Sequence, residues 1–522
     1  TLINFGDNSN SNNCNVNVSN VDFSLSEIFQ ALTQVGNNPS PGPDLIPALF
    51  LQRCRYALSV PIFIIFQLSI SSGIFPDKWK LSYVTPIFKS GHKGSVTNYR
   101  PISIISVIPK LFEKIINNKL TTTFKSTLLS NQYGFRSQRS NSTNLLVFYS
   151  DLISTVESGG QVDVIYTDLK KAFDTVDNKI LLYKLKLMGV HGTLLNWFES
   201  YLSNRRQRVK VNNILSDSIE VTSGVPQGGH LSPLLFLLFV NDLNKTFKYS
   251  KFLLFADDLK LYNPINTPNN CLELQDDIDR FSEWCSMNKL NINVNKCQQI
   301  TFSRRTNPIQ FSYQIHNVSL NVVSSVKDLG VWLSSDLSFK LHLDKMYKKA
   351  LKVLGFIRRN TWEFKNPTCI KVLYCSLVRT ILEYCSVVWN PFTGNWVNKL
   401  ESIQNRFLQF LAPKLRLPIN NISNVAKQCG LDPLSKRRLF NDVNYIYKLI
   451  NNQIDCPDLL TKIKFKVPTF NSRNHSLFHI DCHRQNYSYY SPLNRMCMFC
   501  NKFTNFDFFN DPPGLLYSLS TM

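Results

Sequence analysis

The stretch Phe252-Leu253-Leu254-Phe255-Ala256-Asp257-Asp258-Leu259-Lys260-Leu261-Tyr262 decides how this chain is interpreted. Two apolar runs flank the adjacent carboxylates Asp257 and Asp258, which predicts two short strands joined by a tight turn. Adjacent carboxylates repel each other unless a cation neutralises them, and Mg²⁺ prefers such oxygen ligands. An Asp-Asp turn is more often a solvated loop, so the rest of the chain has to decide between the two interpretations.

A second acidic position lies upstream, where the apolar run Val164-Ile165-Tyr166-Thr167 ends in Asp168 and a helical pattern follows. If the two strands are neighbours in one sheet, Asp168 and Asp257 converge on one point. Three carboxylates there can hold two Mg²⁺ ions, one lowering the pKa of an attacking hydroxyl and the other stabilising a leaving oxygen. The pattern predicts in-line phosphoryl transfer, with Mn²⁺ as an alternative metal.

Phe173 stands just beyond this strand end. An aromatic ring at that place can lie beneath the sugar of a nucleotide and leave no space for a 2′-hydroxyl, the group that separates RNA from DNA precursors. A core aromatic explains Phe173 equally well.

A glycine-rich loop, Ser223-Gly224-Val225-Pro226-Gln227-Gly228-Gly229-His230-Leu231-Ser232-Pro233, lies between the two acidic sites. Its glycines permit close approach of the backbone to a substrate, and Gln227 offers both a donor and an acceptor. Ser232 and Pro233 are expected to be the N-cap and first residue of the apolar helix that follows. A structural turn accounts for the glycines equally well.

The balance of charge points to a polyanionic partner. The 522 residues include 58 basic and 36 acidic side chains, a formal net charge of +22, and nucleic acid is the first candidate partner. Basic runs at 205–208 and 345–352 are candidate contacts with the backbone of an RNA–DNA duplex, although a solvated surface explains each of them comparably well.

Cysteine usage and hydropathy restrict the class of protein. The 13 cysteines are scattered and odd in number, and no signal peptide precedes them. This favours a reduced intracellular protein, in the nucleus and/or the cytoplasm, over a secreted one. The apolar stretches 58–70 and 231–240 fall short of the ~20 residues of a membrane span, so both are expected to be buried core helices and no membrane partner is expected.

A zinc site is a weaker candidate. Cys497 and Cys500 have zinc-like spacing, with Cys482 and His483 nearby. No second closely spaced pair accompanies them, so zinc is disfavoured.

Further motifs flank the acidic sites in a fixed order. They are Pro41-Gly42-Pro43-Asp44, Asn98-Tyr99-Arg100-Pro101-Ile102-Ser103, Asn131-Gln132-Tyr133-Gly134-Phe135-Arg136, Leu290-Asn291-Ile292-Asn293-Val294-Asn295-Lys296-Cys297 and Val326-Lys327-Asp328-Leu329-Gly330-Val331. Together with the acidic sites and the glycine-rich loop, this series resembles the reverse transcriptase of non-LTR (LINE-type) retrotransposons, the Jockey-like group in particular.

The resemblance implies an α+β fold of the right-hand polymerase type, with fingers, a palm built on an antiparallel sheet, and a helical thumb. Residues 1–38 would be an Asn/Ser-rich segment, disordered to about residue 20, and a short helix. Residues 39–335 would form fingers and palm, residues 336–450 a basic helical thumb-like region, and residues 451–522 an irregular C-terminal extension.

The resemblance also implies roles for individual residues. The catalytic residues and metal ligands would be Asp168, Asp257 and Asp258, assisted by the carbonyl of Leu169. Substrate would be bound by Phe173 as sugar gate and by Gln227, Gly228, Arg100 and Lys89. Lys296 would protonate the leaving group, and Leu329 with Gly330 would form the primer grip. An arginine fork suits a triphosphate, although Arg100 could equally belong to a structural ion pair and Lys296 to a solvated loop.

The function implied is that of an RNA-directed DNA polymerase that copies retrotransposon RNA in target-primed reverse transcription. Its partners would be an RNA template, a DNA primer or target and dNTPs, and the upstream endonuclease of such elements is expected to be missing from this chain. Gly229-His230 and Leu45 depart from the family pattern. Two alternatives stay open: an inactive, element-derived nucleic-acid-binding protein, and an RNA-dependent RNA polymerase, which Phe173 disfavours.

Overall fold

The computed structural model describes residues 16–37, 41–212, 214–467, 476–483, 485–503, 506–511 and 514. The expected N-terminal disorder lies outside the described residues as far as residue 15. From Val16 onwards the expectation is wrong, because the Val18 N–H donates to the Gly189 carbonyl over 2.9 Å and the Val18 carbonyl accepts from the His191 N–H over 3.0 Å.

A central sheet organises the molecule, with strand order β12-β9-β3-β8-β7. Its strands are β3 (Gln161–Thr167), β7 (Lys251–Phe255), β8 (Asp258–Ile265), β9 (Gln298–Ser303) and β12 (Asn321–Val322). β3 pairs antiparallel with both β8 and β9, and β7 with β8 is the hairpin expected from the sequence. The condition set by the sequence, that the strands bearing the acids are neighbours in one sheet, is therefore met.

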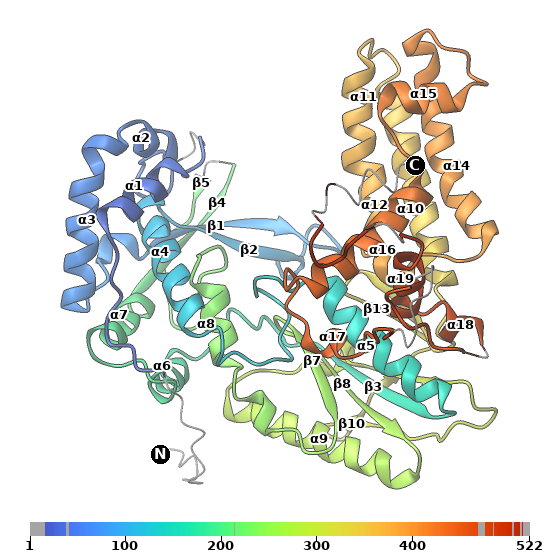
Figure 1. Ribbon diagram of the computed structural model, residues 1–522. Coiled ribbons are helices and arrows are strands. Elements are labelled where there is room, and N and C mark those ends of the chain that lie inside the picture. Colours follow the sequence, from blue (N-terminus) through green and yellow to red (C-terminus); the bar gives the residue numbers. More distant parts are fainter. Residues whose placement is uncertain are drawn as a thin grey trace.

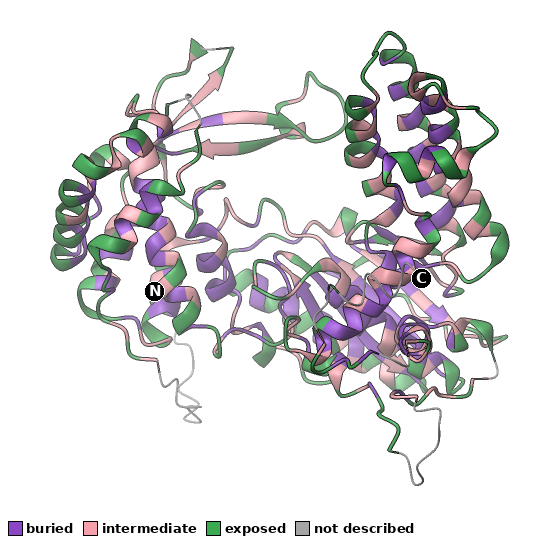
Figure 2. Ribbon diagram, turned by 45° about the horizontal axis from the view of Figure 1, so that its top comes forward, coloured by how far each residue is buried: buried purple, intermediate pink, exposed green. Residues whose placement is uncertain are grey.

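Both faces of this sheet are covered, because successive side chains of a strand point to opposite faces. On β3, Val164 belongs to one apolar core and Ile165 to the other. Helix α5 (Asn141–Glu157) packs on the first face, and helix α9 (Pro268–Met287) contacts β8 and contributes to the second core. Figure 2 shows the buried centre formed by these strands and helices.

The N-terminal half adds a second sheet and several helices. The sheet contains β1 (Leu81–Phe88), β2 (Tyr99–Ile104), β4 (Arg205–Val211), β5 (Ile214–Leu215) and β6 (Ile219–Val221). The helices are α1 (Leu25–Thr33), α2 (Ala48–Arg53), α3 (Arg55–Ser72), α4 (Val107–Thr123), α6 (Asn178–Leu187), α7 (Gly192–Leu202) and α8 (Ser232–Phe239). The β1–β2 hairpin reaches out from these helices towards the C-terminal helices (Figure 1).

Two expectations about helices need correction. The helical pattern after Asp168 begins only at Asn178, because turns occupy the residues between them. Helix α3 is not a fully buried core helix: Phe66 is buried, whereas Tyr56 and Leu68 are 73% and 62% exposed. Within the described residues α3 is the one helix long and apolar enough to cross a membrane by length and composition, a test that core helices also pass.

The C-terminal third is largely helical. Its elements are the hairpins β10–β11 (Gln314–Ile315, Val318–Ser319) and β13–β14 (Ser325–Asp328, Val331–Ser334), followed by α10 (Lys340–Asn360), α11 (Pro367–Tyr374), α12 (Thr380–Glu383), α13 (Ser386–Trp389), α14 (Gly394–Leu411), α15 (Ile422–Cys429), α16 (Leu434–Ile450), α17 (Pro457–Leu460), α18 (Asn486–Tyr489) and α19 (Pro492–Cys500). The described part of 451–522 thus contains short helices and is less irregular than expected.

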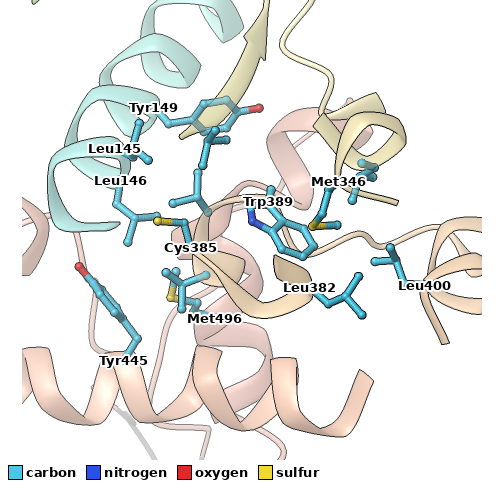
Figure 3. Close-up of a cluster of buried hydrophobic side chains, with 14 of the residues drawn as sticks. Leu145, Leu146, Tyr149, Met346, Leu382, Cys385, Trp389, Leu400, Tyr445 and Met496 are labelled. Carbon is cyan, nitrogen blue, oxygen red and sulfur yellow. The ribbon is translucent and has the colours of Figure 1, made fainter. Parts of the chain in front are cut away.

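These C-terminal helices share an apolar core with α5. Figure 3 shows Leu146 of α5 beside Cys385, with Trp389, Tyr445 and Met496 in the same cluster. The helical region is therefore packed directly against the layer that supports the central sheet, which bears on how the site is held.

Candidate active site

The three predicted carboxylates meet at one end of the central sheet. The antiparallel register pairs Thr167 with Leu259, so Asp168 follows the end of β3 just where β8 begins with Asp258. Residues 255–258, which we call the carboxylate turn, connect β7 to β8, and Ala256 within it adopts φ +59°. The sequence prediction that these carboxylates converge is consistent with this geometry.

Asp168 is partly compensated by its neighbours. Its Oδ2 accepts a hydrogen bond from Asn293 Nδ2 over 2.9 Å, and Lys296 Nζ lies 3.5 Å from the same oxygen. The backbone carbonyl of Asp168 accepts from the Asn293 N–H over 2.7 Å, and Leu169 forms a bridge with Ile292. Lys296 and Leu169 therefore both lie at the carboxylate site, as predicted, while their roles stay predictions.

The carboxylate turn concentrates negative charge. Burial, followed by the charge of Asp168, raises the pKa of Asp257 above its usual range. Partial desolvation, followed by the charges of Asp257, Asp328 and Asp168, raises the pKa of Asp258 to about 6. Opposite charge nearby would lower both values, so the site has room for additional positive charge.

The donor set fits divalent cations. Carboxylate oxygens are the ligands of Mg²⁺ and Mn²⁺, and Asp257 and Asp258 are partly buried carboxylates whose pKa values are raised by burial and by neighbouring acids. Within the described residues, no group of three or more His, Cys, Asp or Glu side chains is placed so that it could hold a metal ion as it stands. Asp168, Asp257 and Asp258 are the residues that would hold the ions.

Two predicted phosphate ligands face the same place from the second sheet. Arg100 lies on β2 and Lys89 just after β1, and both are exposed. Their positive charges lower the pKa of Asp257, which sets them within electrostatic range of the carboxylate turn. Their role as ligands of a triphosphate stays a prediction.

Phe173 and Gln227 are both held by neighbouring residues. The half-buried Phe173 ring stacks on Phe236 of α8 with centroids 4.5 Å apart and meets Phe135 edge-on at 6.0 Å. Gln227 Nε2 donates to Asp174 Oδ1 over 2.8 Å. Packing and a role at the site are both compatible with this position of Phe173.

The glycine-rich loop approaches β2 very closely. Gly228 has φ +127°, and a Cβ on it would lie 2.5 Å from the Ser103 carbonyl oxygen. The Ser103 N–H in turn donates to the Gln227 carbonyl over 2.7 Å. The N-cap prediction is wrong by one residue: α8 begins at Ser232, whose hydroxyl donates to the Pro226 carbonyl over 2.6 Å instead of capping the helix.

Leu329 and Gly330 lie at the tip of the β13–β14 hairpin, as the primer-grip prediction requires. The Tyr384 hydroxyl, from the end of α12, donates to the Leu329 carbonyl over 2.8 Å. At the base of the tip, Asp328 forms a buried ion pair with Lys260 of β8. A cavity of about 380 Å³ joins this hairpin to the carboxylates, with Asp168, Asp258, Lys260, Lys296, Asp328 and Leu329 in its lining.

Several residues of the site are absent from the sequence prediction. Asp174 and Asp328 lie inside motifs that the resemblance covers, so motif membership could have flagged them. Glu113 of α4, only 1% exposed, accepts from the His230 N–H over 2.7 Å and from the Tyr201 hydroxyl over 2.9 Å. A single glutamate in this helix carries no sequence signal of these two contacts.

Two other sequence candidates lie away from the site. Arg205 is 4% exposed and donates to the Tyr201 carbonyl over 3.1 Å, so it does not present its charge to a duplex. Cys497 and Cys500 belong to the apolar core, where burial raises the pKa of the Cys497 thiol to about 12, whereas zinc requires a thiolate. The expectation against zinc stays a prediction.

Residues 89–357, just over half of the chain, match the family described as "Reverse transcriptase (RNA-dependent DNA polymerase)". The chain belongs to this reverse transcriptase family. The family resemblance inferred from the motifs is thereby confirmed, and an α+β fold with mixed sheets agrees with it.

Curated relatives from Drosophila melanogaster extend the similarity beyond that range. The chain is 25% identical over 404 residues to the "Probable RNA-directed DNA polymerase from transposon X-element", covering 74% of this chain and 44% of the relative. It is 27% identical over 405 residues to the "Probable RNA-directed DNA polymerase from transposon BS", covering 74% and 44%. The "RNA-directed DNA polymerase from mobile element jockey" is 25% identical over 401 residues, covering 74% and 43%. The chain thus spans less than half the length of these relatives.

Proposed function

We propose that this chain is an RNA-directed DNA polymerase that copies retrotransposon RNA into DNA by two-metal nucleotidyl transfer, in target-primed reverse transcription. The observation that carries the proposal is the position of Asp168 at the end of β3, beside the carboxylate turn that opens β8. This pair of sites lies inside the region that matches the reverse transcriptase family.

In the proposed reaction the primer 3′-hydroxyl oxygen bonds to the α-phosphorus of a dNTP, and the bond to pyrophosphate breaks. Mg²⁺ ions held by Asp168, Asp257 and Asp258 would make the hydroxyl more acidic and stabilise the leaving oxygen. Arg100 would bind the triphosphate, because its guanidinium can contact two phosphate oxygens at once. Lys296, whose side chain is 60% exposed and lies 3.5 Å from Asp168 Oδ2, would donate a proton to the pyrophosphate.

The architecture that we propose for this reaction is a right hand. The central sheet with α5 and α9 would be the palm, the β1–β2–β4 sheet with α1 to α4 the fingers, and α10 to α16 the thumb. The boundaries near residues 38, 335 and 450 are part of this proposal. An intracellular site of action, in the nucleus and/or the cytoplasm, follows from the same substrate assignment.

Phe173 is the residue proposed to select DNA precursors. Phe173 is half-buried, and its backbone carbonyl accepts from the Val225 N–H of the glycine-rich loop over 2.9 Å. Phe173→Val should raise the ratio of rNTP to dNTP incorporation, on the order of tenfold. The smaller valine side chain leaves space for the 2′-hydroxyl of an rNTP, so the pocket discriminates less against it.

Primer extension tests the proposal. The full chain with Mg²⁺, a DNA primer and an RNA template should extend with dNTPs and do so poorly with rNTPs, and chelation of Mg²⁺ should stop extension. A preference for rNTPs would indicate an RNA-dependent RNA polymerase. Binding of primer–template without any incorporation would indicate an inactive nucleic-acid-binding protein, and either result would overturn the proposal.

A further inference from the structure

The segment 131–139 runs alongside β7 up to the carboxylate turn. The Leu254 N–H donates to the Asn131 carbonyl and the Tyr133 N–H donates to the Leu254 carbonyl, each over 2.9 Å. Asn131 Nδ2 also donates to the Phe252 carbonyl over 2.9 Å. The segment therefore acts as a short additional strand at the edge of the sheet, next to the turn that carries Asp257.

The side chain of Gln132 grips the turn itself. Its Oε1 accepts from the Ala256 N–H over 2.9 Å, and its Nε2 donates to the Ala256 carbonyl over 3.1 Å. Gln132 is 2% exposed and Ala256 is in the left-handed region at φ +59°, which is strained for a residue with a side chain. Both backbone groups of the strained residue are thus fixed by one buried amide.

Close contact at this place depends on a glycine. A Cβ on Gly134 would lie 2.3 Å from the Ala256 nitrogen, and the Gly134 N–H donates to Gln132 Oε1 over 2.9 Å. Only a residue without a side chain lets the segment approach the turn closely enough for the Gln132 contacts.

Arg139 ties this segment to the C-terminal region. Its Nη1 donates to the Gln132 carbonyl over 3.1 Å, and its Nε donates to Asp455 Oδ2 over 2.9 Å. The guanidinium also lies 5.0 Å from the centroid of the Tyr133 ring. The Arg139 side chain is only 5% exposed. It lies buried between Gln132, which contacts the carboxylate turn, and the loop that follows α16.

The loop that follows α16, residues 451–456, is bonded to the segment in several places. The Asp455 N–H donates to the Gln138 carbonyl over 3.0 Å, and Gln138 Nε2 donates to the Asn452 carbonyl over 3.1 Å. Although burial opposes it, the hydrogen bond and charge of Arg139, with the charge of Arg136, hold the pKa of Asp455 below its usual range. Asp455 is therefore an ionised anchor of the segment.

We propose that Asp455 and Gln132 are positioning residues for the reaction: Asp455 holds Arg139 and the 131–139 segment, and Gln132 fixes Ala256, so that Asp257 is kept in place. The inference rests on the proposed function for its catalytic consequence. The inference gives the C-terminal region a role in the reaction, although no residue of that region is among the proposed metal ligands.

Hydrogen–deuterium exchange of the full chain tests the structural half without requiring activity. In the peptide 252–259, Gln132→Met should speed exchange of the Ala256 amide on the order of tenfold, because its acceptor is lost. Asp455→Asn should speed exchange of the same amide, Asp455→Glu should restore protection, and Asp458→Asn, an exposed acid three residues away, should change nothing. Equal protection in Asp455→Asn and Asp458→Asn would overturn the proposal.

Single-turnover dNTP incorporation tests the catalytic half. Gln132→Met should lower the rate on the order of 100-fold and Asp455→Asn about tenfold, with affinities for dNTP and primer–template nearly unchanged. The double variant should match Gln132→Met alone, because both changes act through one contact. If the rate losses of the two single variants multiply in the double variant, Asp455 and Gln132 act independently and the proposal is overturned. A wild-type chain that incorporates nothing would count against the proposed function, but it would leave the exchange result valid.

Discussion

Asp442 in α16 and Asp257 in the carboxylate turn are both acids inside the fold, yet their surroundings differ. Asp442 is fully buried, and its oxygens accept from Arg495 Nε over 3.1 Å and from Asn390 Nδ2 over 2.8 Å. In the part of the chain that the structure describes, Asp257 accepts no hydrogen bond from another side chain, and Asp168 and Asp258 crowd it.

The difference separates stability from function. A buried acid matched by a guanidinium and an amide stabilises the packing around it, and losing the acid leaves the partners uncompensated. Crowded acids at a strained turn cost stability and persist where the charge has a task. Asp442 is accordingly assigned to the fold and Asp257 to chemistry, and substitutions of the two acids can break that assignment.

The largest expected effect is on activity. Asp257→Asn should lower dNTP incorporation by at least about 1,000-fold, since several kcal/mol of transition-state stabilisation is lost at roughly 1.4 kcal/mol per factor of ten. The thermal unfolding midpoint should stay the same or rise, because a repulsion is relieved. Asp279→Asn, on the exposed surface of α9, is the control and should leave both unchanged. A large fall in the midpoint of Asp257→Asn would break the comparison.

The second effect falls on stability. Asp442→Asn should lower the free energy of unfolding by about 3–5 kcal/mol, because Arg495 becomes a buried charge without its partner. Urea unfolding followed by circular dichroism measures this quantity. A loss below about 1 kcal/mol would show that the network is not structural.

A third change concerns His342, buried in the helical region. Burial lowers its pKa to about 4, and its Nδ1 accepts from the Trp332 N–H over 3.3 Å. Between pH 6.5 and pH 4 the His342 imidazole is protonated in the unfolded chain but not in the folded chain. The free energy of unfolding therefore has its full value above about pH 6.5 and falls as the pH drops towards 4.

The lowering of the His342 pKa from about 6.5 to about 4 corresponds to about 3 kcal/mol of unfolding free energy. His342→Gln should flatten the slope of unfolding free energy between pH 6.5 and pH 4 in urea titrations. An unchanged slope in this variant would assign the pH dependence to other groups.

The smallest effects come from two glycines. Gly228→Ala places a Cβ 2.5 Å from the Ser103 carbonyl at φ +127°, and should cost about 1–3 kcal/mol of unfolding free energy. Gly394→Ala, in α14 with nothing within 4 Å, should be neutral or stabilising by up to about 1 kcal/mol. Equal midpoints for the two variants in thermal unfolding would contradict the close approach at the glycine-rich loop.

The sequence was sufficient for the local parts of the site. Alternating and flanking apolar runs predict β3, β7 and β8, and the acids at their ends converge because strands of one sheet share an edge. Ordered motifs supplied the family. Helix α3 was misjudged, because an apolar run without clear periodicity gives no sign that one of its faces stays exposed.

What the sequence could not supply are the long-range partners. Gln132 forms a hydrogen bond with Ala256, which is 124 residues away in the sequence, and Arg139 forms one with Asp455, which is 316 residues away. Nothing in a glutamine or an aspartate indicates its partner at such separations, because local propensity and periodicity report only neighbours along the chain. Tertiary packing alone brings these residues to the carboxylate turn.

Counting bound Mn²⁺ is the most direct test of the claim that the crowded acids are reserved for metal ions. Electron paramagnetic resonance of free Mn²⁺ gives the count for the full chain with an RNA–DNA primer–template and a non-hydrolysable dNTP. We predict about two ions for the wild-type chain and for Asp279→Asn, and fewer for Asp257→Asn. Equal Mn²⁺ binding by the wild-type chain and Asp257→Asn would contradict the account.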